Sequence, residues 1–252
     1  MIKSLIFAHR GANKEAAENT RSAFDKALEY AIDGMETDVQ LSRDEVAVLW
    51  HDRFLGKLGM PTKHIDDFDY ASLQQMNFAA HFAATAKPEG VMSLQAFLDA
   101  YCQRCRLLIE IKNRTWESAS RRDMKVRQTL EMIGGEMIGA ARDDRVLVSS
   151  FNLDSLVYAH QCAPQFPLVY NLEPEQKLDE ARRVLIEQPF LHGLCLPIES
   201  LNEAMVELLR GHEKSIAVYT CNSDEEISKA LDLGVDILIS DVPQKALQMR
   251  DK

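Results

Sequence analysis

The sequence is short of positive charge, of long hydrophobic runs and of paired cysteines. Its 29 Lys and Arg residues stand against 39 Asp and Glu residues, so the formal net charge is −10. A protein that binds nucleic acid non-specifically is normally basic, because it must neutralise backbone phosphates. The charge balance therefore argues against a nucleic-acid-binding protein. A small anionic substrate stays compatible with it, since a metal ion or a few local Arg and Lys side chains can reverse the local field.

The hydrophobic runs are too short for a membrane protein. The apolar stretch after Met1-Ile2-Lys3 ends at Ala8, which is too short for a signal-peptide core or a membrane span. The cysteines are odd in number: Cys102, Cys105, Cys162, Cys195 and Cys221. This pattern indicates reduced thiols in a cytoplasmic protein with no stable membrane anchor, rather than a disulfide framework. The lone Cys-x-x-Cys is expected to be two residues of a helix.

What the sequence does contain is a regular alternation of apolar runs and helix-like stretches. The runs are 4–9, 34–39, 107–112, 145–150, 167–171, 193–197, 215–221 and 235–240. Residues 20–33 have a helical apolar face with Gly34 just after it, and Ser223 and Glu226 form a capping-box pattern before residues 223–233. Pro243 suits the first turn of a last helix. About eight such repeats predict one α/β domain over 1–252, a (β/α)8 TIM barrel.

Two segments interrupt this alternation. Residues 40–51 resemble a hairpin with its turn at 42–45, which we expect to be an excursion after the second barrel strand. Residues 52–92 contain no strong strand before a helix that starts near Ser93. We expect them to form a small, partly helical insertion subdomain after the second strand, covering one mouth of the barrel. Its apolar residues, such as Phe54, Phe78 and Phe82, could form either its own core or a membrane-seeking rim.

Charged residues gather where the predicted strands end, at the end of the barrel where such folds keep their chemistry. The candidate site residues are His9, Arg10, Glu36, Asp38, His51, Glu110 and Lys112. Glu36 and Asp38 are two residues apart on one strand, so both point to the same face. Three carboxylates on adjacent strands would repel one another unless a cation lies between them. Oxygen ligands favour a hard ion, Mg²⁺ or Ca²⁺, over zinc.

The remaining candidates suit phosphate chemistry. Two imidazoles, His9 and His51, can act as a general base and a general acid near neutral pH. Arg10 offers a planar fork and Lys112 a point charge for phosphate oxygens. Together with a divalent cation, these groups indicate a site that cleaves a phosphodiester.

In the motifs that carry these residues, the sequence resembles the glycerophosphodiester phosphodiesterase family. The motifs are "HRG" (9–11), "ENT" (18–20), "ETD" (36–38), "HD" (51–52), "EIK" (110–112), "SSF" (149–151) and "SDVP" (240–243). The resemblance implies a TIM barrel of the phospholipase C-like phosphodiesterase type. It also implies metal-dependent hydrolysis of glycerophosphodiesters to an alcohol and sn-glycerol 3-phosphate.

The resemblance assigns roles to the candidate residues. It implies that Glu36, Asp38 and Glu110 bind the metal, that His9 and His51 are the catalytic pair, and that Arg10 and Lys112 contact the phosphate. The sequence departs from the family pattern after the HD motif, where "RFLGKLGMPTK" lacks the usual Arg-Thr-Thr. Tyr219-Thr220 replaces the usual Trp-Thr, and Ser240-Asp241 replaces Thr-Asp. These departures concern the rim where the alcohol group would lie.

Several expectations concern neighbouring residues and rival functions. Glu18 and Asn19 are expected only to cap the first helix, because Asn is a good N-cap. Trp50, Phe151 and Tyr219 are expected in the core, with an apolar wall for the glycerol group as the alternative. A lysophospholipase D or phosphoinositide phospholipase-like activity is the alternative enzyme, and it would require an apolar rim. A catalytically silent binding protein on the same barrel is disfavoured by the presence of all five histidine and carboxylate candidates.

Overall fold

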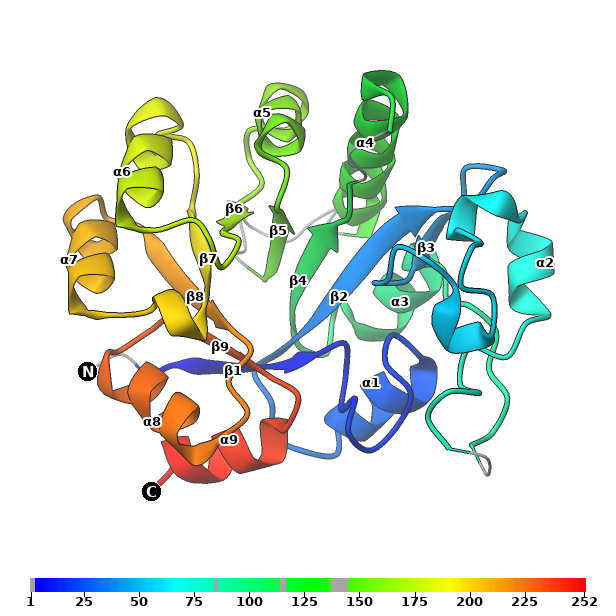
Figure 1. Cartoon of the computed structure of the whole chain (residues 1–252), viewed down its shortest axis with the longest axis horizontal. Coiled ribbons are helices and arrows are strands. Elements are labelled where there is room, and N and C mark those ends of the chain that lie inside the picture. Colours follow the sequence, from blue (N-terminus) through cyan, green and yellow to red (C-terminus); the bar gives the residue numbers. More distant parts are fainter. Residues whose placement is uncertain (1–2, 84–85, 114–116, 137–144) are drawn as a thin grey trace.

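The computed structural model describes residues 3–83, 86–113, 117–136 and 145–252. Over these residues, eight strands form a closed parallel barrel, as the sequence predicted (Figure 1). They are β1 (Leu5–His9), β2 (Gly34–Leu41), β4 (Arg106–Ile111), β5 (Val146–Ser150), β6 (Leu168–Asn171), β7 (Gly193–Pro197), β8 (Ser215–Tyr219) and β9 (Ile237–Ser240). The order runs β1-β9-β8-β7-β6-β5-β4-β2, and pairing of β1 with β2 closes the ring.

Helices surround the barrel on its outer face (Figure 1). They are α1 (Arg21–Ala27), α3 (Leu94–Tyr101), α4 (Ala119–Glu136), α5 (Leu153–Cys162), α6 (Leu178–Glu187), α7 (Glu203–Gly211), α8 (Asp224–Asp232) and α9 (Pro243–Arg250), with a 3-10 turn η3 (Ile198–Ser200) before α7. The predicted capping box of Ser223 and Glu226 opens α8, and Pro243 opens α9. Ser93 caps α3 by accepting a hydrogen bond from the Ala96 N–H. No helix of the described ranges is long and apolar enough to cross a membrane.

Two boundary predictions were wrong. The first helix ends at Ala27, not near residue 33, so Gly34 is no helix cap but the first residue of β2. A glycine is needed at position 34 for packing, because a Cβ there would lie 2.5 Å from the Phe7 ring. The second error concerns the cysteine pair, since α3 ends before Cys102 and Cys105 lies in the following turn. Both thiols are free, as are the other three.

The hairpin after the second strand is confirmed. The strand β3 (Ala47–Leu49) pairs antiparallel with the end of β2 and, among the described residues, with no other strand of the barrel, so it is an excursion from the barrel. The Ser42 N–H donates to the Val46 carbonyl across the turn. The hairpin therefore carries the chain out of the barrel just before His51.

Residues 52–92, the insertion, contain three short helical elements. They are η1 (Gly56–Leu58), η2 (Ile65–Asp67) and α2 (Tyr70–Gln74). Five buried residues of the insertion join Val48 and Trp50 of the preceding hairpin in one apolar cluster: Leu55, Ile65, Leu73, Phe78 and Val91. Leu58, Met60 and Phe68 pack against this cluster, whereas Phe82 is 37% exposed. Most apolar side chains of the insertion thus form its own core rather than a rim.

The inside of the barrel is filled by side chains that alternate with those facing the helices. Its apolar layer consists of Phe7, Leu108, Leu147, Val169, Cys195, Ala217, Ile237 and Ile239. Above this layer, the parallel register sets His9 beside Glu36 and Asp38 beside Glu110. Because parallel strands end at the same rim, the polar residues of β1, β2 and β4 gather at the carboxyl-terminal mouth.

Candidate active site

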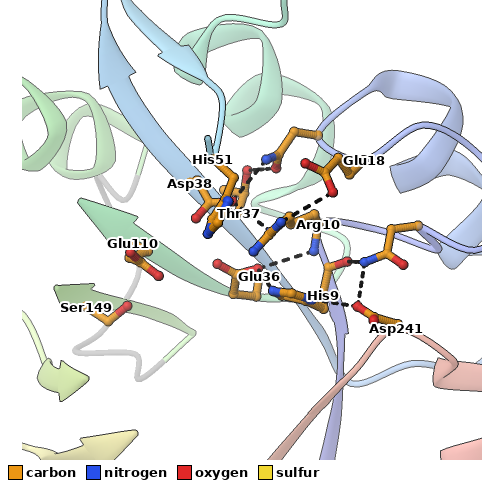
Figure 2. Close-up of polar contacts among 12 residues, drawn as sticks. His9, Arg10, Glu18, Glu36, Thr37, Asp38, His51, Glu110, Ser149 and Asp241 are labelled. Carbon is orange, nitrogen blue, oxygen red and sulfur yellow. Dashed lines mark hydrogen bonds and ion pairs between the residues drawn. The ribbon is translucent and has the colours of Figure 1, made fainter. Parts of the chain in front are cut away.

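Three buried carboxylates meet at this mouth (Figure 2). Glu36 and Asp38 come from β2, and Glu110 comes from the neighbouring β4. One oxygen of each lies within 4.8 Å of the other two. The structure thus brings together the three acids that the sequence placed on adjacent strands.

The surroundings of these acids fit an oxygen-bound cation. Burial, and then the charge of Asp38, raise the pKa of Glu36 well above its usual value. Although burial opposes it, the positive charge of Arg10 holds the pKa of Asp38 below its usual value. Oδ1 of Asp38 accepts no hydrogen bond from the described residues, and the Lys112 Nζ lies 3.6 Å from it. A buried orphan oxygen among crowded carboxylates is what a hard divalent ion would satisfy.

His9 lies at the end of β1 and is held by a carboxylate. Its Nδ1 lies 2.6 Å from Oδ1 of Asp241, and its Nε2 lies 3.8 Å from Oε2 of Glu36. Asp241 also accepts hydrogen bonds from Asn13 (2.6 Å) and Asn222 (3.0 Å). Burial lowers the pKa of His9, and the hydrogen bond to Asp241 opposes that shift. A carboxylate partner requires a proton on Nδ1, so the neutral ring presents Nε2 as a proton acceptor.

His51 follows β3 and has a similar partner. Its Nδ1 lies 2.8 Å from Oδ1 of Asp52. The other oxygen of Asp52 lies 3.0 Å from the Nζ of Lys57. Against the effect of burial, the hydrogen bonds from His51 and Lys57 lower the pKa of Asp52 to about 2. The site therefore contains two histidine–aspartate pairs, and both histidines line the same cavity as Glu36 and Glu110.

Two cations face the cluster. Arg10, with a φ of 56°, places its Nε 3.1 Å from Asp38 and its Nη1 3.3 Å from Glu18. Lys112, one residue beyond β4, places its Nζ 2.7 Å from Glu110. Burial acts to lower the pKa of both cations, but the neighbouring carboxylates raise both above their usual values. Both side chains therefore stay charged at neutral pH, as groups that bind phosphate oxygens must.

The prediction that Glu18 and Asn19 only cap the first helix was wrong. Thr20, whose φ of −111° suits a cap, accepts the hydrogen bond from the Ala23 N–H. Asn19 has a φ of 56°, donates to Oδ2 of Asp38 at 3.0 Å and accepts from the Thr37 hydroxyl at 2.8 Å. Asn19 therefore orients Asp38, while Glu18 orients Arg10.

A cavity of about 180 Å³ opens between these groups. The site residues on its wall are His9, Arg10, Glu36, His51 and Glu110, and Leu108, Cys195 and Ile239 form an apolar floor. Phe151 and Tyr219 also line it, with ring centroids 5.9 Å apart and edge to face, so the expectation that these two belong only to the core was wrong. Trp50 is in the core of the insertion, as expected. A neighbouring cavity of about 420 Å³ shares His51, Glu110 and Phe151 with it.

Sequence reasoning missed Asp241 as the partner of His9. A usable signal was present, because Asp241 follows the buried strand β9, and β9 pairs with β1 in the closed barrel. Its carboxylate therefore had to emerge at the same rim as His9. The partnership of Lys57 with Asp52 and Glu18 carried no such signal, since it depends on how the insertion folds back.

Comparison with known proteins gives matches over nearly the whole chain. Residues 9–245 match the glycerophosphoryl diester phosphodiesterase family. A glycerophosphodiester phosphodiesterase of Bacillus altitudinis is 29% identical over 98% of each chain. An Oleispira antarctica phosphodiesterase, solved in complex with the product sn-glycerol-3-phosphate, superimposes with a TM-score of 0.86 at 23% identity, covering 99% of this chain and 98% of its own. A glycerophosphodiester phosphodiesterase from Parabacteroides distasonis gives a TM-score of 0.80 at 21% identity, over 99% and 97% of the two chains.

The family match begins at His9 and extends past Asp241, so it includes every residue placed above at the mouth of the barrel. It covers nearly the whole chain, and the solved structures share the complete barrel rather than one part of it. The chain therefore belongs to the glycerophosphoryl diester phosphodiesterase family, a family of hydrolases.

Proposed function

We propose that this enzyme hydrolyses glycerophosphodiesters to an alcohol and sn-glycerol 3-phosphate, using two histidines for proton transfer. The observation that carries the proposal is the pair of histidine–aspartate contacts, at 2.6 and 2.8 Å, whose histidines both line one cavity. The related Oleispira antarctica enzyme, which shares the fold, was solved with sn-glycerol-3-phosphate as its product.

We also propose that Glu36, Asp38 and Glu110 hold one divalent cation, Mg²⁺ or Ca²⁺. Their converging oxygens and the orphan Oδ1 of Asp38 support such an ion. The ion would supply neutralisation of the phosphoryl oxygens as negative charge develops on them. Arg10 and Lys112 would add to this, since both remain cationic beside the same carboxylates.

The two histidines divide the proton transfers between them. Nε2 of His9 takes the proton from the glycerol hydroxyl next to the phosphate. That hydroxyl oxygen attacks phosphorus and the bond to the alcohol oxygen breaks. His51 donates a proton to the departing alcohol. The remaining product on the enzyme is a cyclic phosphate. Water then opens the ring with the proton transfers reversed, so each histidine returns to its starting state.

The organisation of the chain follows the same proposal. We assign residues 1–252 to one catalytic domain, with 52–92 as a small subdomain within it. Five free cysteines are compatible with a reducing compartment, and we place the enzyme in the cytoplasm. A lipid-directed phosphodiesterase receives little support, because Leu55 and Phe78 are buried in the insertion core rather than exposed.

The test is hydrolysis of glycerophosphocholine and glycerophosphoglycerol, with sn-glycerol 3-phosphate as the measured product. We expect turnover by the wild type, loss of turnover in EDTA and recovery on adding Mg²⁺ or Ca²⁺. Since one acid–base group is typically worth roughly 10²- to 10⁴-fold in rate, His9→Ala and His51→Ala should be nearly inactive yet folded. Binding of these diesters without turnover would instead make the chain a binding protein. Near-normal activity of either variant would remove that histidine from the pair.

A further inference from the structure

Lys57, on the short helix η1 of the insertion, lies between the two halves of the site. We infer that Lys57 is a positioning residue. It holds two carboxylates in place: Asp52, the partner of His51, and Glu18, the partner of Arg10. The inference rests on the proposed function for its catalytic consequence. It assigns a role to a stretch, "RFLGKLGMPTK", where this chain departs from the family pattern.

The contacts of Lys57 are short and go to two carboxylates. Its Nζ lies 2.6 Å from Oε1 of Glu18 and 3.0 Å from Oδ2 of Asp52. The side chain of Lys57 is 31% exposed, and that of Glu18 is 14% exposed. Burial opposes the charge of Lys57, but the hydrogen bonds to these two acids raise its pKa above the usual value. The ammonium therefore stays charged where two carboxylates meet.

Each of these carboxylates uses its second oxygen on the site itself. Oε2 of Glu18 accepts from Nη1 of Arg10 at 3.3 Å, and Oδ1 of Asp52 lies 2.8 Å from Nδ1 of His51. Arg10 in turn lies 3.1 Å from Asp38 through its Nε. An unbroken series of ion pairs and hydrogen bonds thus runs from Asp38 of the carboxylate cluster to His51, and Lys57 joins its Arg10–Glu18 part to its Asp52–His51 part.

Loss of the Lys57 charge should disturb both ends of this series. Glu18 and Asp52 would then face each other as two partly buried anions with no cation between them. Glu18 could pair more fully with Arg10 and draw it from Asp38, while Asp52 could turn to solvent and release His51. Because the chemistry depends on placement, a lysine that touches no substrate can change the turnover rate.

The insertion thereby becomes part of the active site. Lys57 belongs to η1, beside the buried cluster that contains Leu55 and Trp50. Its Nζ also lies 5.9 Å from the centre of the Trp50 ring. The folding of the insertion therefore fixes where the ammonium stands, and through it the orientation of His51.

The test compares Lys57→Met and Lys57→Gln with Lys57→Arg, which keeps the charge. Lys26→Met is the matched control, because Lys26 also bridges two carboxylates, at 2.6 and 3.7 Å, and is similarly exposed at 34%, but lies on α1 away from the cavity. Hydrolysis of glycerophosphocholine is measured for each variant. The hydrogen bond of His51 is followed by side-chain ¹⁵N NMR, with the signal assigned from His51→Gln, and folding by thermal unfolding.

We expect Lys57→Met and Lys57→Gln to lower kcat by about 10- to 100-fold with KM little changed, since outer partners of site residues typically have effects of this size. We also expect a changed His51 Nδ1–H signal in both, substantial recovery in Lys57→Arg, and no change in Lys26→Met. Wild-type kcat together with an unchanged His51 signal in both neutral variants would overturn the inference. The inference would also be overturned if the rate loss came with global unfolding and the His51 signal of the folded fraction stayed unchanged. An inactive wild type would refute the proposed function, while the NMR comparison would still decide the placement of Lys57.

Discussion

Replacement of Asp241 by Asn removes the negative charge beside His9 and keeps the shape of the side chain. In the proposed mechanism His9 accepts a proton, and its imidazolium then stands next to a carboxylate oxygen that is 2.6 Å from Nδ1 and belongs to a side chain only 13% exposed. Two unit charges about 4 Å apart attract by about 4 kcal/mol at an effective dielectric constant of 20. That energy corresponds to roughly a thousandfold in rate. The amide could also turn its NH₂ group toward His9 and favour the wrong tautomer.

We therefore expect Asp241→Asn to lower kcat by roughly 10²- to 10³-fold. The expected loss extends below the full thousandfold because the NH₂ groups of Asn13 and Asn222 can still donate to the oxygen of the new amide. The assay is steady-state hydrolysis of glycerophosphocholine by folded protein, as judged by circular dichroism. Asp224→Asn is the control, because Asp224 lies at the start of α8, is 73% exposed and pairs with Lys245.

A second variant makes the prediction stricter. If Asp241 acts through His9, adding Asp241→Asn to His9→Gln should cost little more than His9→Gln alone, since the two residues act as a unit. Near-wild-type turnover by folded Asp241→Asn would refute the reasoning, because a proton-accepting His9 could not be indifferent to this charge. Fully multiplicative losses in the double variant would show that Asp241 does not act through His9.

Two further predictions concern stability. The pKa of Asp52 is lowered to about 2 from a usual 3.8, so its carboxylate stabilises the fold fully above about pH 4 and this contribution is lost as the pH falls toward 2. Allowing for solvent screening, the unfolding free energy of the wild type should exceed that of Asp52→Asn by about 1–2 kcal/mol at pH 6 and by nearly nothing at pH 2. Urea titrations at the two pH values measure this difference, and a difference that does not change with pH would contradict the prediction. Gly34→Ala should lower the unfolding free energy by about 1–3 kcal/mol, because the new Cβ would lie 2.5 Å from the Phe7 ring. Gly135→Ala is the control, because Gly135 lies on an exposed part of α4 and the new Cβ would have no atom within 4 Å. This variant should raise the unfolding free energy by about 0.5 kcal/mol. Equal effects of the two alanine substitutions would refute the packing argument.

The barrel could be predicted because each of its repeats carries a local signal. Strands buried in a parallel barrel are short apolar runs, and the helices between them have recognisable caps such as Ser223 with Glu226. The end of the first helix could not be placed in this way. The apolar pattern continues past Ala27, and only the packing of Gly34 against Phe7 shows that this glycine serves the barrel.

In the candidate site, too, only the residues with a local sequence signal could be predicted. Glu36, Asp38 and Glu110 could be expected together, because strand periodicity and parallel register fix where their side chains emerge. Asn19 could not, since its role depends on a φ of 56° that the loop adopts in the folded protein. Lys57 could not either, because its flexible side chain meets Glu18 only after residues 52–92 have folded.

The most direct test of the account is a crystal structure of the protein soaked with Mn²⁺, which has oxygen-ligand preferences close to those of Mg²⁺ and can be located by its anomalous signal. We predict one ion coordinated by oxygens of Glu36, Asp38 and Glu110, and no ion at this position in Glu110→Gln. A strong anomalous peak elsewhere, or three carboxylates that stay unliganded at saturating Mn²⁺, would contradict the claim that these acids share a cation.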